Sequence, residues 1–249
     1  MTISGAPMAA AASSAGIAAR VAGHLPAANG TPPAGAMARA MVRAAYDRAS
    51  HVYRGDTLAL ERTGYDFWLR RFTRPLAANA RVLDLGCGNG VPVVRELARR
   101  FDVTGLDHSP IQIARARALV PGARFLCADM VECGFAAASF EGIVAFHSII
   151  NLPLDEHAPL IRRLAGWLVP GGRVLATVGR LARTQVEHDW RGVRGASMFW
   201  SHAGIDTYRA WFTEAGLAID EEGVEPKHGN PGYAVLIAHR PTAEPAPGA

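Results

Sequence analysis

The feature that most constrains the fold is the stretch RVLDLGCGNG at positions 81–90. Residues 82–85 read as a buried strand, although Asp84 interrupts the apolar run. A purely structural strand would gain nothing from this aspartate. Three alternating glycines then form a turn, and 91–100 reads as a helix. Glycines at such a junction allow a tight turn and let a ligand approach main-chain N–H groups. The start of the following helix also favours negative charge.

A second acidic residue strengthens this interpretation. The next predicted strand ends in TGLD, which places Asp107 roughly 20 positions after the first glycine. That spacing suits a carboxylate that accepts hydrogen bonds from a nucleoside ribose in a βαβ unit. A glycine turn alone is weak evidence, because many strand-to-helix corners carry glycine. The pair of signals predicts a nucleoside-binding unit.

These residues also carry a family resemblance. VLDLGCGNG at 82–90, followed by VTGLDHSPIQIARAR at 103–117, resembles the first two motifs of class I S-adenosylmethionine-dependent methyltransferases. The Gly-x-Gly-x-Gly spacing and the Asp inside the strand differ from nicotinamide dehydrogenases, whose turn is Gly-x-Gly-x-x-Gly. The resemblance runs from about 46 to 240, which is most of the chain that we expect to fold.

The expected fold is α/β: a Rossmann-like, doubly wound, seven-stranded sheet whose last strand is antiparallel, with a small N-terminal helical lid. Alternating strand and helix patterns support it. Strands are expected near 81–85, 102–106, 123–128, 141–147, 172–178, 217–222 and 233–239. Helices are expected near 37–50, 57–71, 91–100, 110–119, 155–168 and 203–215. Residues 179–201 show no clear period and are expected to form a long connection.

The domain organisation follows from local composition. We expect a disordered Ala/Pro-rich tail at 1–36, a helical cap at 37–75, the cofactor-binding methyltransferase domain at 76–240 and a flexible tail at 241–249. The chain is 49% hydrophobic and 19% charged, which is ordinary for a globular protein, and no apolar run approaches a membrane span. The three cysteines lack CxxC spacing, which fits core thiols in a reducing cytoplasm.

The resemblance implies a set of contacts to S-adenosylmethionine. The glycine turn would approach the methionine moiety, Asp84 would hold its amino group and Asp107 would accept from the ribose hydroxyls. His108 stands where the family usually has an apolar residue against adenine, so an imidazole would stack there. The complete set of expected cofactor contacts is Tyr46, Asp84, Gly86, Gly88, Asn89, Gly90, Asp107, His108, Asp129, Met130 and His147.

Within that set, Asp129 and Met130 belong to a third element, FLCADM at 125–130. Asp129 would hold the adenine amino group, with Met130 beside the ring. The alternative for Asp129 is a helix cap, but its place at the end of a predicted strand favours a ligand-binding role. Glu132 is interpreted as a solvated neighbour.

The acceptor side is expected to follow the fourth strand and the long connection. His147 could act as a base, but lining the methionine pocket is the preferred interpretation. Relatives commonly carry a histidine at the position of Asn151, which here can only orient a substrate by hydrogen bonds. Trp200 and His202 resemble a segment that lines the substrate side in related enzymes, and His202 is the second candidate base. A metal site at His188, Asp189 and His202 is rejected because no ligand spacing demands it.

The resemblance thus implies methyl transfer from S-adenosylmethionine to an O, S or N nucleophile of a small organic acceptor, by in-line displacement. The formal net charge is +4, but no basic and aromatic cluster indicates nucleic acid. We therefore expect a cytoplasmic monomer or homodimer that acts on a metabolite, with no nucleic-acid or membrane partner. Two alternatives stay open: a rearrangement or cyclisation enzyme that binds the same cofactor, and a non-catalytic binding module.

Overall fold

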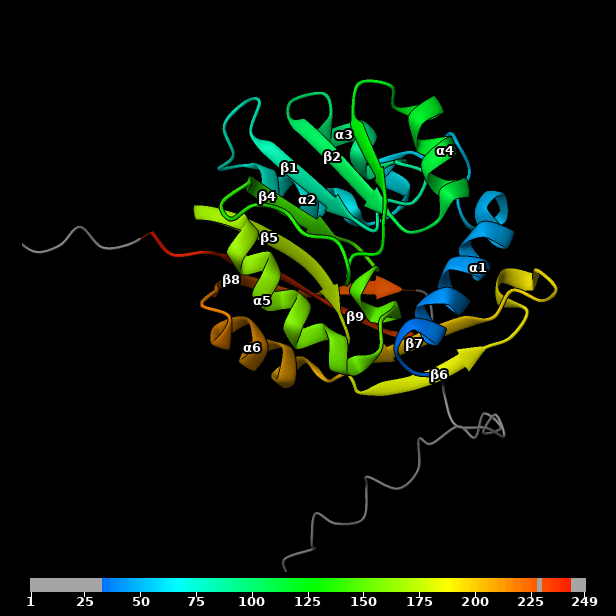
Figure 1. The fold of residues 1–249 in the computed structure, drawn as a ribbon. Coiled ribbons are helices and arrows are strands. Elements are labelled where there is room, and N and C mark those ends of the chain that lie inside the picture. Colours follow the sequence, from blue (N-terminus) through cyan, green and yellow to red (C-terminus); the bar gives the residue numbers. More distant parts are fainter. Residues whose placement is uncertain (1–32, 228–229, 243–249) are drawn as a thin grey trace, which may run out of the picture. The chain divides into compact units, whose positions relative to one another are not determined.

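A central mixed sheet organises the protein in the computed structural model, which describes residues 33–227 and 230–242 (Figure 1). The expectations for 1–32 and 243–249 lie outside these residues. Seven strands form the sheet in the order β3-β2-β1-β4-β5-β9-β8. Their bounds are β1 (Arg81–Leu85), β2 (Asp102–Asp107), β3 (Arg124–Cys127), β4 (Phe140–Ala145), β5 (Leu168–Val178), β8 (Ala218–Lys227) and β9 (Asn230–His239).

The strand pairing confirms the predicted fold class. Neighbouring strands from β3 to β5 run parallel, whereas β9 is antiparallel to both β5 and β8. The chain moves outward from β1 to β3 and then returns to place β4 on the other side of β1. Such a reversal leaves a crevice at the carboxyl ends of β1 and β4, where ligands bind in open α/β sheets.

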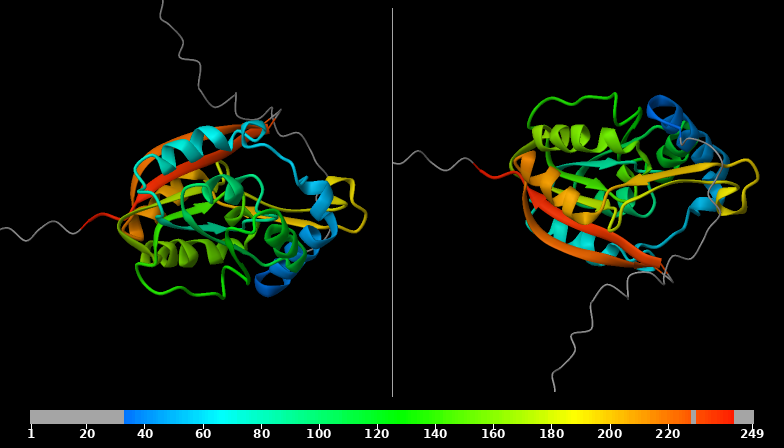
Figure 2. Two further views of the ribbon diagram at one scale, coloured as in Figure 1. Left: turned by 90° about the horizontal axis from the view of Figure 1, so that it is seen from above. Right: turned by 90° about the horizontal axis from the view of Figure 1, so that it is seen from below.

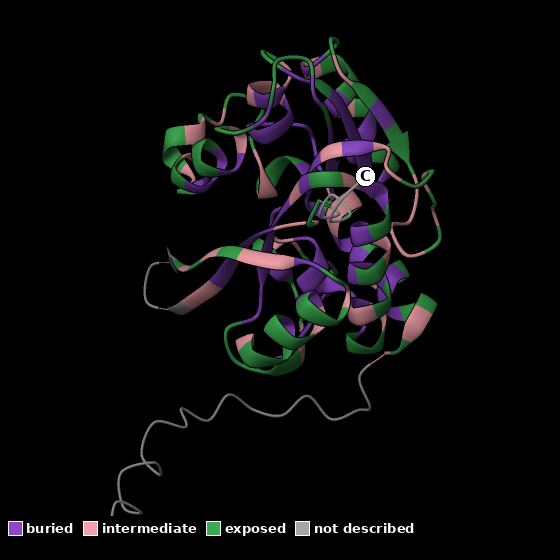
Figure 3. Ribbon diagram, turned by 90° about the vertical axis from the view of Figure 1, so that its left-hand side faces the viewer, coloured by how far each residue is buried: buried purple, intermediate pink, exposed green. Residues whose placement is uncertain are grey.

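Helices cover both faces of the sheet (Figure 2). The helices on one face are α2 (Tyr65–Thr73), α3 (Val93–Leu97) and α4 (Pro110–Leu119), and those on the other are α5 (His157–Trp167) and α6 (Ile205–Glu214). Strand residues alternate between the two cores: Leu83 and Leu85 face α5 and α6, and Val82 faces α2 and α3. Figure 3 shows the buried residues concentrated in the strands and on the helix faces that turn toward them.

A third core joins α1 (Gly35–Tyr53) to a small two-stranded sheet of β6 (Arg183–Glu187) and β7 (Met198–His202). Four residues of one face of α1 pack on the hairpin: Ala38, Val42, Ala45 and Ala49. The hairpin contributes Trp190, Ala196, Met198 and Phe199. In Figure 1, α1 and the yellow hairpin lie side by side. The long connection expected at 179–201 is present, but most of it forms this hairpin, which the sequence pattern did not predict.

The N-terminal helices also differ from expectation in extent and role. The second helix begins at Tyr65 rather than at 57, because Gly64 adopts a left-handed φ of +78° and only a short 3-10 turn, η1 (Leu60–Arg62), precedes it. That helix packs on the sheet, so the lid consists of α1 and the hairpin. The helix expected at 91–100 is confined to α3. The prediction that all three thiols fill the core is wrong for Cys127, which is exposed.

Candidate functional site

A cavity lies at the carboxyl ends of the central strands, under α1. The space between its walls measures about 610 Å³, part of which is open to solvent. We call it the inner cavity. Nine residues expected at the site line it: Tyr46, Gly86, Gly88, Asp107, His108, Asp129, Met130, His147 and Asn151.

The three glycines of the turn after β1 have different surroundings, although all have positive φ. A side chain on Gly86 would meet the Cβ atom of Ser148 at 2.3 Å, so only glycine fits there. Gly88 has no atom within 4 Å of the place that a Cβ would take, which leaves its backbone open to a ligand. Gly90 instead packs against Phe125 and other core side chains, away from the cavity wall.

Asp107, at the end of β2, is fixed by the backbone around it. One carboxylate oxygen accepts from the N–H of Gly88 at 2.9 Å, and the other accepts from the N–H of Ser109 at 2.9 Å. Burial raises the pKa of Asp107 above its ordinary value, whereas the neighbouring His108 and these two N–H donors oppose the shift. The residue therefore joins the glycine turn to the start of α4 and presents a rigid acceptor at the cavity.

Asp84 lies deeper, near the end of β1, and is buried without contributing to the cavity wall. Its pKa is raised to about 7, mainly by burial and also by the charge of Asp107, while the charge of Arg54 opposes the shift. No hydrogen bond joins its carboxylate to another residue in the described part of the chain. A buried carboxylate without hydrogen-bond donors favours a cationic partner. Asn89, beside it in the turn, is also buried, and its side-chain oxygen accepts from the N–H of Val91 at 3.3 Å.

Arg54 is the main residue that the sequence reasoning missed. Its guanidinium donates to the carbonyl of Val91 at 3.2 Å and to the hydroxyls of Tyr53 and Tyr65 at 3.3 and 3.4 Å. Burial opposes its charge, but these tyrosines and Asp84 raise its pKa overall. The sequence signal is slight, because Arg54 lies in the short link between the helices predicted at 37–50 and 57–71. In the structure, Arg54 is a cation in the cavity wall.

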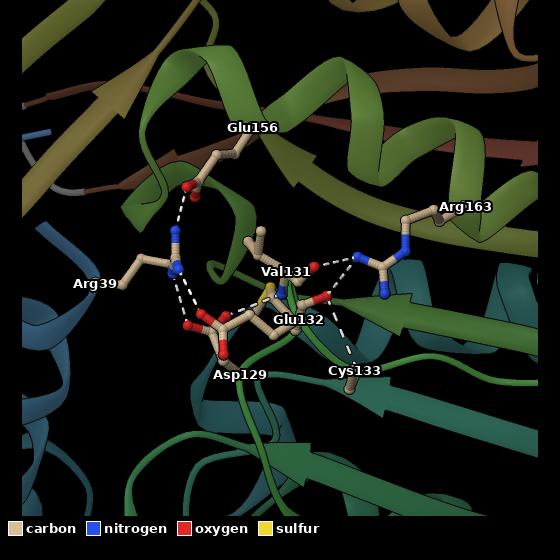
Figure 4. A network of polar contacts seen from close by, with 8 residues as sticks. Arg39, Asp129, Val131, Glu132, Cys133, Glu156 and Arg163 are labelled. Atoms are coloured by element: carbon tan, nitrogen blue, oxygen red, sulfur yellow. Dashed lines mark hydrogen bonds and ion pairs between the residues drawn. The ribbon is translucent and has the colours of Figure 1, made fainter. Parts of the chain in front are cut away.

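At the opposite end of the inner cavity, Arg39 of α1 binds three carboxylates (Figure 4). Its Nε lies 2.6 Å from Asp129 and its Nη2 lies 2.8 Å from Glu132, while Nη1 contacts Glu156. The second oxygen of Asp129 accepts from the N–H of Val131 at 2.9 Å. Glu132 is exposed, as expected, but is paired. The expected adenine acceptor, Asp129, is thus also the residue that holds α1.

His147 follows β4 and lies between aromatic rings. It has a φ of +50°, and its ring centroid lies 5.0 Å from that of Tyr233 and 5.7 Å from that of Tyr65. Positive φ is uncommon for residues other than glycine, and such strained positions cluster at functional sites. His147 lines the inner cavity and also the space outside it.

We call that neighbouring space the outer cavity. It is lined by Tyr46, Tyr53, Arg54, Leu58, Arg62, Thr63, Gly64, Tyr65, His147, Trp190, Arg191, Trp200 and Tyr233. Four of these residues also line the inner cavity: Tyr46, Tyr53, Arg54 and His147. A side pocket that shares four other members, among them Trp200, adds Arg183, Gln185, Glu187 and His202. The structure therefore places most of the expected site residues around two adjoining spaces, whereas Asp84, Asn89, Gly90 and His202 line neither of them.

The expected acceptor-side residues have distinct placements. Asn151 is buried, and its amide donates to the carbonyl of Phe199 at 2.9 Å, so it fastens β7 to the core and also lines the inner cavity. Trp200 lines the outer cavity and donates from its indole N–H to Glu187 at 3.1 Å. His202 lines only the side pocket, and burial lowers its pKa. Among the described residues, no group of three or more metal-ligating side chains is positioned to hold an ion.

Comparisons with known proteins agree with this geometry. The model of a family described as methyltransferase domain matches residues 82–172. The trans-aconitate 2-methyltransferase of Methylobacterium nodulans is 33% identical over 159 residues, 59% of this chain and 60% of that protein. The ubiquinone biosynthesis O-methyltransferase of Xanthomonas euvesicatoria is 30% identical over 169 residues, 60% of this chain and 67% of that protein. An S-adenosylmethionine-dependent methyltransferase structure from Mesorhizobium loti has a TM-score of 0.60 at 22% identity and covers 73% of this chain and 100% of that one.

The chain belongs to the class I S-adenosylmethionine-dependent methyltransferases. Its cofactor is S-adenosylmethionine. The matched region spans only 60% of the first relative and 67% of the second, so part of the length of each has no counterpart in the alignment. Within the described residues, no helix combines the length and the apolar character that a membrane crossing needs.

Proposed function

We propose that the protein transfers a methyl group from S-adenosylmethionine to an O, S or N atom of a small organic acceptor. The observation that carries this proposal is the junction of the two cavities. The inner cavity has the glycine turn and the acidic groups that suit the cofactor, and it meets the outer cavity at Tyr46, Tyr53, Arg54 and His147. Two reactants held on either side of one junction are positioned for direct displacement.

The residues present fit the cofactor. The open backbone at Gly88 admits the methionine end, and Asp84, which lies behind the cavity wall, would hold its ammonium group through water. Arg54 would hold the methionine carboxylate, because it is a buried cation whose described contacts include no carboxylate hydrogen bond. Asp107 would accept from the ribose, and Asp129 from the adenine amino group. His108 and Met130 line the cavity where the adenine ring would stack.

The bound cofactor supplies an activated methyl group: the sulfur–carbon bond breaks, its electron pair stays on sulfur, and the acceptor atom forms the new bond to carbon. The protein holds the acceptor in line and limits the access of water. His147 stands at the junction and Asn151 lies beside it with its amide committed to Phe199. We assign His147 to the wall, and no single residue to an obligatory base.

The test combines binding with product analysis. Calorimetry should detect one site per chain for S-adenosylmethionine and for its demethylated product. Incubation with a methyl-labelled cofactor and an acceptor panel should yield a product that carries the label. A product rearranged without the label would replace methyl transfer by cyclisation or rearrangement. Cofactor binding without any turnover across the panel would support a binding module instead.

We further propose that the protein acts in the cytoplasm as a monomer or homodimer, on a metabolite rather than on nucleic acid. Three cysteines without paired spacing suit a reducing compartment. The scattered arginines lack the interleaved aromatic pattern of nucleic-acid sites. Fractionation of the native cells and light scattering of the purified protein would test the compartment and the oligomeric state.

A further inference from the structure

Aromatic rings form the walls of the outer cavity. Tyr53 and Trp190 have ring centroids 5.1 Å apart, and Tyr46 lies edge-on to Trp190 at 5.2 Å. Trp200 and Tyr233 supply further ring surface, and both are only half-buried. Aromatic faces that stay accessible in a cavity offer stacking surface to a flat ligand. The half-buried rings of Trp200 and Tyr233 therefore favour a planar acceptor, whereas Trp190 is buried in the core between α1 and the hairpin.

The charge of the same cavity is one-sided. Three arginines line it, Arg54, Arg62 and Arg191, and none of the described lining residues is Asp or Glu. The guanidinium of Arg191 lies over the rings of Tyr53 and Trp190, with its carbon 5.7 and 5.6 Å from their centroids. The adjoining side pocket contains Glu187, which accepts from the indole N–H of Trp200. A cavity lined by one sign of charge attracts ligands of the other sign.

Arg62 and Arg191 differ from Arg54 in being exposed. Neither forms an ion pair with a carboxylate in the parts of the chain at 33–227 and 230–242. Arginine presents paired N–H donors that match the two oxygens of a carboxylate. Two such groups beside an aromatic wall suit an acid whose flat body stacks while its carboxylate reaches the arginines.

We propose that the acceptor is a planar, conjugated carboxylic acid, with its ring system between the aromatic walls and its carboxylate on Arg62 and Arg191. This inference rests on the proposed function, because it assigns the outer cavity to the acceptor. The acid is ionised at neutral pH. Its negative charge also complements the positively charged sulfonium on the other side of the junction.

Three matched probes separate charge from shape: trans-cinnamate, its neutral amide cinnamamide, and 3-cyclohexylpropanoate, which keeps the charge but lacks the flat body. Binding is measured by ligand-observed NMR on protein saturated with S-adenosylhomocysteine. Cinnamate should bind about tenfold more tightly than cinnamamide, since a carboxylate–arginine pair is strong but partly screened at an exposed site. It should also bind more tightly than 3-cyclohexylpropanoate, because only the flat body stacks on the aromatic rings. The preference should weaken as salt is raised.

Variants locate the charge recognition. R62Q and R191Q together should reduce cinnamate affinity about tenfold and leave cinnamamide unchanged. R194Q is the matched control, because Arg194 is exposed on the same hairpin but does not line either cavity. Equal binding of cinnamate and cinnamamide, or an R194Q effect as large as that of the double variant, would overturn the proposal.

The two proposals fail in different ways. If S-adenosylhomocysteine does not bind, the cofactor site and the proposed function fail together. If it binds and the labelled methyl group is transferred only to neutral or non-planar acceptors, the methyltransferase assignment holds and the acceptor class is wrong. Transfer to conjugated acids, with KM raised by the double variant and kcat little changed, would support both.

Discussion

The inner and outer cavities meet at four residues but are built in opposite ways. The inner cavity presents carboxylates, Asp107 and Asp129, which accept from backbone N–H groups, together with Arg39 and Arg54. The outer cavity presents arginines and rings that come from α1 and the residue after it, η1, α2, the hairpin and β9. A space whose carboxylates are fixed by backbone N–H groups, beside a basic, aromatic one without described carboxylates, separates the tasks of holding a constant cofactor and selecting a variable acceptor.

Removing the Arg39 guanidinium, which pairs with Asp129 and Glu156, should have the largest effect on stability. R39M would leave Asp129 and Glu156 partly buried without their arginine, and breaking such a pair costs about 3 kcal/mol. The loss should be full at neutral pH and shrink on acidification as Glu156 is protonated, and burial raises the pKa of that carboxyl above its ordinary value. Chemical denaturation would measure it, with R43M as the control on the exposed face of α1. Equal stability of both variants would show that the ion pairs of Arg39 with Asp129 and Glu156 do not stabilise the fold.

Cofactor affinity should depend on the carboxylate at the end of β2. D107A removes an acceptor for the ribose, and a charge-assisted hydrogen bond contributes about 1.5–3 kcal/mol. We therefore expect the affinities for S-adenosylmethionine and its product to fall by roughly 10- to 150-fold. D107N, which keeps the shape, should lie between the wild type and D107A. Calorimetry that gave unchanged affinity for D107A would refute the assignment of Asp107.

The predictability of the two cavities from sequence differs for a physical reason. Gly86, Gly88 and Asp107 act through local backbone geometry, so their spacing alone carries the signal, and the strand order confirmed the fold that they imply. Arg54 and Tyr233 reach the outer cavity only through long-range packing, which no local pattern encodes. Their part in the site therefore required the structure.

The hairpin shows the same limit at the level of secondary structure. Strand β6 (RTQVE) has little apolar alternation, because most of its residues are exposed. Its strand conformation depends on pairing with β7, and that pairing is stabilised by α1, more than a hundred residues earlier in the chain. The cap helix at 57–71 was overextended for a local reason, the left-handed backbone at Gly64.

A smaller, pH-dependent effect is expected at Asp84. Burial raises its pKa from 3.8 to about 7, so the unfolded state ionises first and stability should decline as pH rises between these values. D84N should abolish this decline and make the protein without cofactor about 2–3 kcal/mol more stable relative to wild type at pH 8 than at pH 5. E61Q, at an exposed surface position, is the control. If the melting temperatures of D84N and wild type changed with pH in the same way, the raised pKa of Asp84 would be contradicted.

The smallest catalytic effects are expected for the two candidate histidines, His147 and His202, which line different cavities. His147 stands at the junction, and His202 lines only the side pocket with a pKa lowered by burial. Alignment of the reactants supplies most of the rate, so H147A and H202A should each reduce it by less than about 100-fold, below the usual upper range for loss of a general base. H147N, which tolerates positive φ, controls for backbone strain at His147. A loss of about 1000-fold in H147A and H147N, with cofactor affinity intact and a rate–pH limb near a histidine pKa, would make His147 the base. The junction would then perform proton transfer as well as alignment.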